Sequence, residues 1–210
     1  MFGIHDLTLF IISGLLLNIM PGPDSLLIMT RSGTQGWRAG VAAVAGIRTG
    51  TMVHVLAAAV GLSAILSTSA IAFTVVKYVG AAYILYMAVA LLRSKRRVPD
   101  AAVSVPPLPY QKIFAQGFLT NVLNPKVAIF FLAFVPQFID AAAPSKALAF
   151  IILGCIFNVN GILWSVALAL FVAFASARLK LNPSVSQWLN RVTGGLFIWL
   201  GIKLALSKQG

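Results

Sequence analysis

Six apolar runs, each long enough to cross a lipid bilayer, constrain the fold of this chain more than any other feature. A membrane-spanning helix needs about 20 mostly apolar residues. Candidate spans run from Leu7 to Met29, Ala39 to Ala64, Ile71 to Leu92, Ile113 to Ile139, Ala147 to Ala175 and Trp188 to Leu206. Backbone in lipid must satisfy its hydrogen bonds internally, and the alternating pattern of barrel strands is absent, so all six are predicted to be helices. The sequence therefore predicts an all-α polytopic membrane protein with six transmembrane helices.

Composition supports this class and excludes several functions. Hydrophobic residues make up 60% of the chain and charged residues 10%, whereas about 25% of the residues of a soluble domain are charged. The net charge of +12 does not indicate nucleic-acid binding, because the cations lie in short breaks between apolar runs. The single cysteine, Cys155, excludes an internal disulfide and a cysteine-rich metal site. We expect no metal, cofactor or nucleic-acid partner.

The loop cations predict the orientation, since Lys and Arg are enriched in cytoplasmic loops. Most of them lie in the first, third and fifth connections: Arg31, Arg38, Arg93, Lys95, Arg96, Arg97, Lys112, Arg178 and Lys180. We therefore place these connections in the cytoplasm and both termini outside a bacterial-type inner (plasma) membrane; a five-span variant would move one terminus. The proline-rich segment 93–112 is predicted to be a flexible cytoplasmic linker, with binding to membrane lipid as a secondary role. The first run lacks a signal-peptide cleavage site and is expected to be a retained span.

The two halves of the chain resemble each other. Residues 14–29, GLLLNIMPGPDSLLIM, align without gaps with residues 117–132, GFLTNVLNPKVAIFFL. The matched identities are Gly14 with Gly117, Asn18 with Asn121, Gly80 with Gly194 and Ile84 with Ile198. Three spans per half make the repeats inverted, which is typical of transporters. We predict a single transporter domain over 1–210, with repeat 1 at about 1–92 and repeat 2 at about 113–210.

The aligned segments each contain a helix break. Pro21 and Pro23 lack a backbone N–H, so the carbonyls of Leu17 and Ile19 lose their helical partners, and Gly22 lets the chain bend. Pro23 is suited to the first turn of a new half-helix.

In the second half, Asn124 is a good N-cap and Pro125 a good first helical residue. Each break thus offers N–H groups for an anion and free carbonyls for a cation, and an amino acid has one group of each kind. A simple proline kink is the structural alternative, but two breaks at matching places favour a binding site.

Charged residues inside spans mark function by default. Asp24 and Arg48 lie about 7 and 13 Å from the cytoplasmic end of their spans, at 1.5 Å per residue. Pairing of the two would reduce the cost of burying either, so a purely structural role is the alternative. The second span also contains GWRAG at residue 36 and GIRTG at residue 46, spacings that favour close helix packing.

Lys126 is deeper, about 20 Å from the cytoplasmic face. A cation in the first turn of a half-helix opposes the helix dipole, so we expect an anion, such as a substrate carboxylate, to bind there. Asp24 is the one acid well inside the spans and is the candidate proton carrier. His54 is a second candidate, although a lone histidine in a span more often serves packing.

Two of these segments also carry a family resemblance. Residues 18–54, beginning NIMPGPD, and residues 117–138, GFLTNVLNPKVAIFFLAFVPQF, resemble the two signatures of the LysE/RhtB amino-acid exporters. The resemblance extends over essentially the whole chain and implies export of amino acids or derivatives, driven by the proton gradient. PGPD resembles the homoserine and threonine efflux branch, whereas exporters of basic amino acids tend to have Gln after PGP. Arg48 departs from the small residue usual in the family and argues against a cationic substrate.

The predicted substrate-binding residues are Asn18, Pro21, Gly22, Pro23, Asp24, Arg48, Asn121, Asn124, Pro125 and Lys126. Alternatives are an exporter of basic amino acids or another small metabolite, or a non-enzymatic channel or structural subunit. A membrane enzyme is disfavoured, because the chain has two histidines, one cysteine and no glutamate from which to build a catalytic pair. The sequence leaves open whether the chain forms a homodimer.

Overall fold

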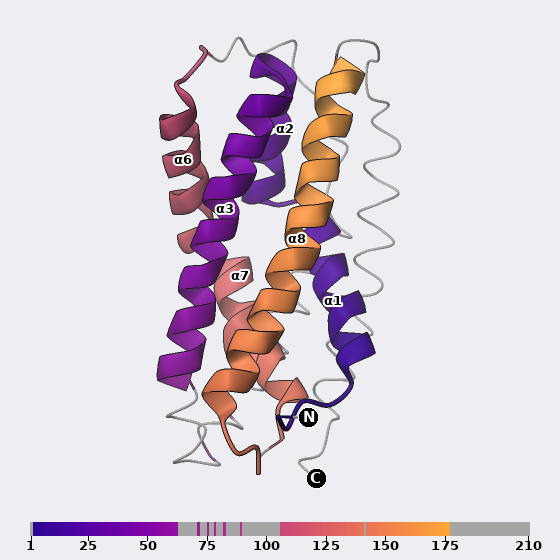
Figure 1. The fold of residues 1–210 in the computed structure, drawn as a ribbon, viewed down its shortest axis with the longest axis vertical. Helices are drawn as coiled ribbons and strands as arrows, with labels where there is room; N and C mark the ends of the chain where they lie inside the picture. The colour runs from indigo at the N-terminus through magenta and orange to yellow at the C-terminus, as the bar shows by residue number, and fades with distance from the viewer. Residues whose placement is uncertain are drawn as a thin grey trace.

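The computed structural model describes residues 2–62, 106–140 and 142–176, together with residues 71, 75, 78, 82 and 89. Its elements are α1 (Leu7–Ile19), α2 (Pro23–Gln35), α3 (Trp37–Ala57), the π-turn η1 (Ala58–Leu62), α6 (Tyr110–Val122), α7 (Pro125–Ile129), the π-turn η2 (Phe130–Phe134), the 3-10 turn η3 (Val135–Phe138) and α8 (Lys146–Ser176) (Figure 1). The described part of the chain is thus all-helical, as predicted, apart from one isolated bridge between Ile4 and Ile139.

Four of the six predicted spans fall within the described residues. Trp37–Gly61 and Lys146–Ala175 are each long and apolar enough to cross a membrane. Two bent pairs of helices are long and apolar enough only when each pair is taken as one span. The first pair is α1 with α2, which bends by 55°, and the second is α6 with Pro125–Phe138, which bends by 47°. Outside the described residues lie the sixth predicted span, most of the third span and most of the linker. The repeat matches Gly80 with Gly194 and Ile84 with Ile198 lie there as well.

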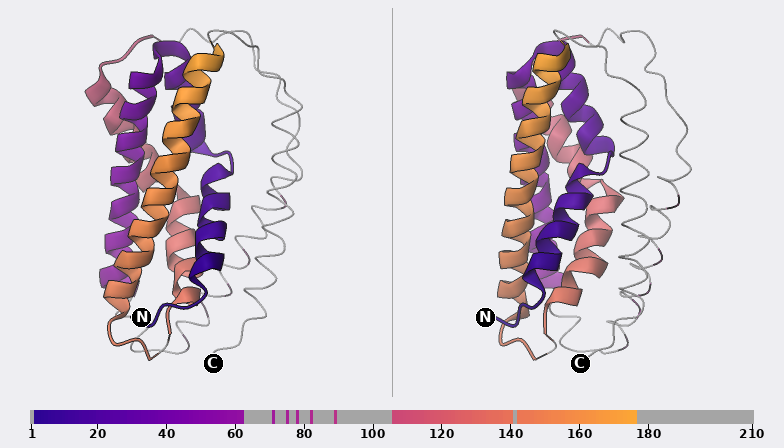
Figure 2. Two further views of the ribbon diagram at one scale, coloured as in Figure 1. Left: turned by 45° about the vertical axis from the view of Figure 1, so that its right-hand side comes forward. Right: turned by 90° about the vertical axis from the view of Figure 1, so that its right-hand side faces the viewer.

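Both bends lie where the sequence predicts a break. Helix α1 ends at Ile19, and Pro23 is the first residue of α2, with Gly22 in an extended conformation before it. In the second half, α7 begins at Pro125, and the Asn124 side chain accepts a hydrogen bond from the Lys126 backbone N–H. Figure 2 shows how the chain steps sideways between α1 and α2. The proline breaks are confirmed as ends and starts of half-helices.

Close helix packing surrounds the breaks. A Cβ atom on Gly46 of α3 would collide with the backbone of Phe114 in α6, and one on Gly117 of α6 would meet the Ala43 carbonyl oxygen of α3. In the same way Gly14 of α1 lies against Phe157 of α8. The small residues therefore let backbones approach, as the spacings in the second span predict.

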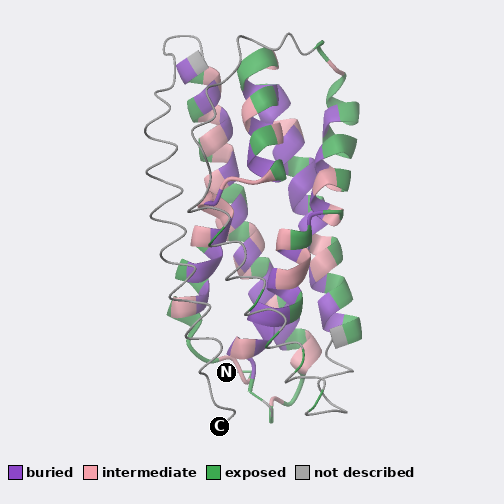
Figure 3. Cartoon of the chain, turned by 180° about the vertical axis from the view of Figure 1, so that it is seen from behind, coloured by how far each residue is buried: buried purple, intermediate pink, exposed green. Residues whose placement is uncertain are grey.

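Two apolar clusters occupy the two halves of the bundle. One is rich in phenylalanine and contains Phe130 and Phe157, whose ring centroids are 4.6 Å apart. The other joins α2, α3, α6 and α8 around Ile28 and Ile47. Other large apolar side chains face outward, and Phe174 is 67% exposed. Figure 3 shows buried and exposed residues along the length of each described helix, which suits a helix between a protein core and lipid.

The ends of the bundle differ in charge. The turn between α2 and α3, the start of α6 and the end of α8 lie at the upper end in Figure 1, and this end carries Arg38 and Lys112. The N-terminal segment and the start of α8 lie at the opposite end, where Asp140 N–H donates to the Gly3 carbonyl oxygen over 2.7 Å. The structure therefore brings Arg38 and Lys112, from the first and third connections, to one end, and Lys146 to the other.

Candidate functional site

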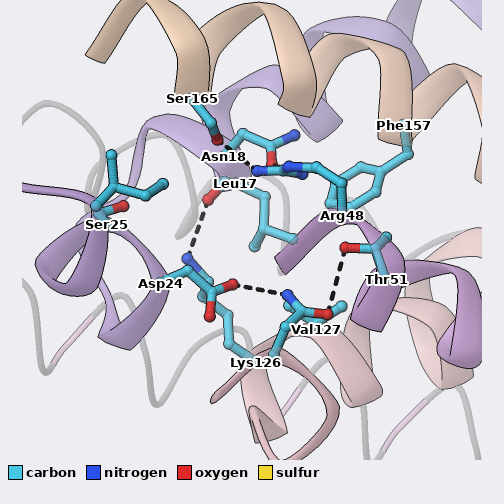
Figure 4. A pocket seen from close by; sticks show the side chains of 12 residues that line it. Leu17, Asn18, Asp24, Ser25, Arg48, Thr51, Lys126, Val127, Phe157 and Ser165 are labelled. Carbon is cyan, nitrogen blue, oxygen red and sulfur yellow. Dashed lines mark hydrogen bonds between the residues drawn. The ribbon is translucent and has the colours of Figure 1, made fainter. Parts of the chain in front are cut away.

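A small cavity lies where the two helix breaks meet. Its lining residues come from both clusters and from six helices, α1, α2, α3, α6, α7 and α8. They are Leu17, Asn18, Asp24, Ser25, Ile28, Arg48, Thr51, Asn121, Lys126, Val127, Phe157 and Ser165 (Figure 4). The cavity volume is about 10 Å³, roughly the space of one water molecule. In the described conformation this space is therefore too small for an amino acid.

Lys126 reaches across from the second break to the first. Its Nζ donates to the carbonyl oxygens of Leu17, at 3.2 Å, and Met20, at 3.1 Å. The Leu17 carbonyl has no helical partner because Pro21, four residues later, has no N–H to donate. Of the two carbonyls that the sequence predicts to be free, Leu17 and Ile19, that of Leu17 thus binds a cation, and the second acceptor is Met20. The cation is a side chain of the other half of the chain.

Asp24 lies in the first turn of α2, where the N–H groups of the helix favour a negative charge. Its side chain is buried, and Oδ2 accepts a hydrogen bond from Asn121 Nδ2 over 2.7 Å. Asn121 Oδ1 in turn accepts from Thr51 Oγ1 over 3.3 Å. Asp24 Oδ1 is buried and has no hydrogen-bond partner among the described residues, so half of this carboxylate is free to bind another group.

Arg48 bonds to neutral partners. Nη1 donates to Asn18 Oδ1 over 3.1 Å and Nη2 to Ser165 Oγ over 2.6 Å, while Nε is buried and unpartnered among the described residues. Gly161 makes room for it, because a Cβ atom there would collide with the guanidinium. The salt bridges of the described residues do not include a pair between Arg48 and Asp24, so the pairing considered from the sequence is not formed.

His54 lies beside the site, not in its lining. Its Nε2 is 3.0 Å from the Asn121 carbonyl oxygen, and its ring stacks on Phe131 with centroids 6.4 Å apart. These contacts are those of a packed, hydrogen-bonded histidine. Among the described residues, Asn121 connects His54 to Asp24. The backbone carbonyl oxygen of Asn121 contacts the His54 ring, and its side-chain amide donates to Asp24.

Five of the predicted residues line the cavity: Asn18, Asp24, Arg48, Asn121 and Lys126. The other five, Pro21, Gly22, Pro23, Asn124 and Pro125, shape the breaks instead. Gly22 comes closest, since a Cβ atom there would be 3.2 Å from Lys126 Nζ. Sequence reasoning missed Thr51 and Ser165, whose only signal is a hydroxyl within an apolar span. Among the described residues, no cluster of three His, Cys, Asp or Glu side chains could hold a metal ion.

The sequence comparisons decide the family. The profile described as LysE type translocator matches residues 15–208. The chain belongs to this family. Membership makes it a membrane translocator and indicates a transporter, not an enzyme.

Individual relatives of this LysE-type protein agree with that assignment. An uncharacterized membrane protein, YrhP, of Bacillus subtilis is 31% identical over 97% of this chain and 100% of its own length. The leucine efflux protein of Salmonella typhimurium is 25% identical over 99% of this chain and 98% of its own. The uncharacterized membrane protein PA4757 of Pseudomonas aeruginosa is 29% identical over 98% and 97%. No solved structure matches the chain.

Proposed function

We propose that this protein exports neutral amino acids from the cytoplasm by a proton-coupled mechanism. The observation that carries the proposal is the cavity at the two helix breaks, whose lining includes one carboxylate and two cationic side chains. An amino acid has an ammonium and a carboxylate that such groups can bind. The efflux proteins among the relatives support the direction of transport.

The charge and lining of the cavity support a neutral substrate. Arg48 and Lys126 outnumber Asp24, so a substrate with an extra positive charge is repelled. Ile28, Val127 and Phe157 supply apolar surface for a side chain of moderate size. The PGPD motif favours homoserine or threonine, and the names of the relatives add leucine as a candidate.

Each charged residue has a proposed role. Lys126 binds the substrate carboxylate, because it is the ammonium group nearest both breaks. Asp24 carries the proton, because it has an unpartnered buried oxygen and is the one acid among the described residues that line the cavity. Substrate and proton then share one site, and their exchange couples the two fluxes.

We also propose that the chain forms two inverted three-helix repeats in the plasma membrane, with 93–112 in the cytoplasm. The described helices support this arrangement in two ways. The bends of 55° and 47° fall at matching places in the two halves. In addition, the first helix of each half packs on the long helix of the other, α1 on α8 and α6 on α3.

The test is uptake of radiolabelled amino acids into everted membrane vesicles from cells that express the protein. Leucine, threonine or homoserine should accumulate when respiration acidifies the lumen, and an uncoupler should abolish accumulation. Lysine and arginine serve as cationic comparisons, and vesicles without the protein give the background. Accumulation of none of these amino acids, or of the basic ones alone, would overturn the proposed function.

A further inference from the structure

The site is already occupied by an ammonium group, that of Lys126. Its Nζ donates to two main-chain carbonyl oxygens, Leu17 O at 3.2 Å and Met20 O at 3.1 Å. These carbonyls lie at the C-terminal end of α1, where the helix dipole also favours a cation. A primary ammonium of any origin fits the same contacts, because they depend on N–H donors and positive charge alone.

Lys126 forms no direct salt bridge among the described residues, although Asp24 is close enough to interact with it electrostatically. The ion pairs formed by the described residues, within 4.0 Å, do not include one between Lys126 and Asp24. Its contacts are to neutral carbonyls, whereas a carboxylate would add the attraction between two full opposite charges. A carboxylate that enters the cavity therefore offers Lys126 a better partner than the carbonyls do.

We propose that Lys126 is a tethered occupant of the subsite for the substrate ammonium, and that the substrate carboxylate draws it out. The proposal rests on the proposed function and deepens it, since it defines the substrate class as compounds with both a free ammonium and a free carboxylate. When Lys126 turns to the carboxylate, Leu17 O and Met20 O lose their donors. Buried carbonyls without donors are costly, so the substrate ammonium must take the vacated place in the same step.

This exchange involves both halves of the chain. In the described conformation Lys126 of α7 ties the second break to the end of α1 at the first break. A zwitterion that replaces this tie separates the two breaks and leaves each with a substrate contact. A ligand with one of the two groups cannot complete the exchange.

The test compares three probes on purified wild-type protein and on Lys126→Ala: L-leucine, its decarboxylated analogue isopentylammonium, and N-acetyl-L-leucine. Binding is measured as ligand-dependent thermal stabilisation. Wild type should bind leucine and neither analogue. Lys126→Ala should lose leucine affinity and gain affinity for isopentylammonium by at least tenfold, because the carbonyl subsite is empty; a charge-assisted hydrogen bond of about 1.5–3 kcal/mol corresponds to about 10–100-fold. Lys112→Ala, an exposed lysine in α6, should behave as wild type.

Equal affinity of isopentylammonium for wild type and Lys126→Ala would overturn the proposal, as would binding of N-acetyl-L-leucine by wild type as tight as that of leucine. If Lys126→Ala does not purify as a folded protein, isopentylammonium during extraction should recover it. The proposal is also overturned if this recovery fails and a folded Lys126→Met variant shows no thermal stabilisation by isopentylammonium. Leucine uptake by wild-type vesicles tests the proposed function separately, because it does not depend on which group binds the carbonyls.

Discussion

At the scale of single residues, Asp24 uses one carboxylate oxygen in a hydrogen bond to Asn121, and the other has no hydrogen-bond partner among the described residues. Asp24 and Arg48 form no direct salt bridge within the described part of the chain. Asp24 stays the proposed proton carrier, and His54 makes the contacts of a packed histidine.

Replacing Asp24 should separate the two fluxes. Asp24→Asn keeps an acceptor oxygen toward Asn121 but cannot carry a proton. We expect proton-driven accumulation to disappear while exchange of internal for external substrate continues, both measured in proteoliposomes. Asp140→Asn replaces an exposed acid at the end of the bundle and is the matched control. It should leave both accumulation and exchange unchanged. Accumulation against a gradient by Asp24→Asn would remove this residue from the proton path.

Replacing Lys126 should remove substrate binding. Lys126→Ala deletes the ammonium that the proposed function assigns to the substrate carboxylate, and loss of one such contact corresponds to about 10–100-fold in affinity. We expect transport of leucine or threonine in vesicles to fall by at least that range at normal membrane expression. Lys112→Ala gives the control for loss of a cation. Unchanged transport by Lys126→Ala would show that the carboxylate binds elsewhere, with Arg48 as the next candidate.

At the scale of elements, glycines on α3 decide how closely it packs on α6. Gly46→Ala places a methyl group against the backbone of Phe114, which cannot move aside as a flexible side chain can. Overpacking of this kind costs about 1–3 kcal/mol. We therefore expect a lower unfolding temperature in detergent for Gly46→Ala. The same substitution at Gly61, where no atom lies within 4 Å, should have little effect. Equal stability of the two variants would contradict the packing described here.

At the scale of the whole molecule, the described structure brings the turn after α2, the start of α6 and the end of α8 to one end. The positive-inside rule predicts that this end faces the cytoplasm. A reporter inserted between Arg93 and Lys112 should therefore give a cytoplasmic signal. In a Cys155→Ser background, Lys112→Cys should be shielded from an impermeant thiol reagent in intact cells, and Lys146→Cys at the opposite end should react. The reverse labelling pattern would invert the topology.

Export should also be visible in whole cells. Overexpression is expected to raise resistance to inhibitory concentrations of threonine, homoserine or leucine and to lower their intracellular pools. The Asp24→Asn variant at equal expression is the control for proton-coupled export. Resistance confined to lysine and arginine would contradict the neutral substrate class.

The sequence by itself determined the helical membrane class, the two long apolar helices Trp37–Gly61 and Lys146–Ala175, and both breaks. These depend on local rules: the apolar length of a run, the missing N–H of Pro21 and Pro23, and the capping side chain of Asn124. Each rule acts within a few residues of the chain, so it can be applied before any tertiary contact is known.

Only the tertiary structure decided which of these residues meet. Asn121, not Arg48, bonds Asp24 across 97 residues of sequence, and Arg48 bonds Ser165 across 117. Lys126 occupies the carbonyls of the other half of the chain, 109 residues away at Leu17. Helix rotation and the close approach of backbones at glycines fix these pairings. They are long-range packing effects, and in a run of uniformly apolar residues no local pattern reports which face of a helix meets which neighbour.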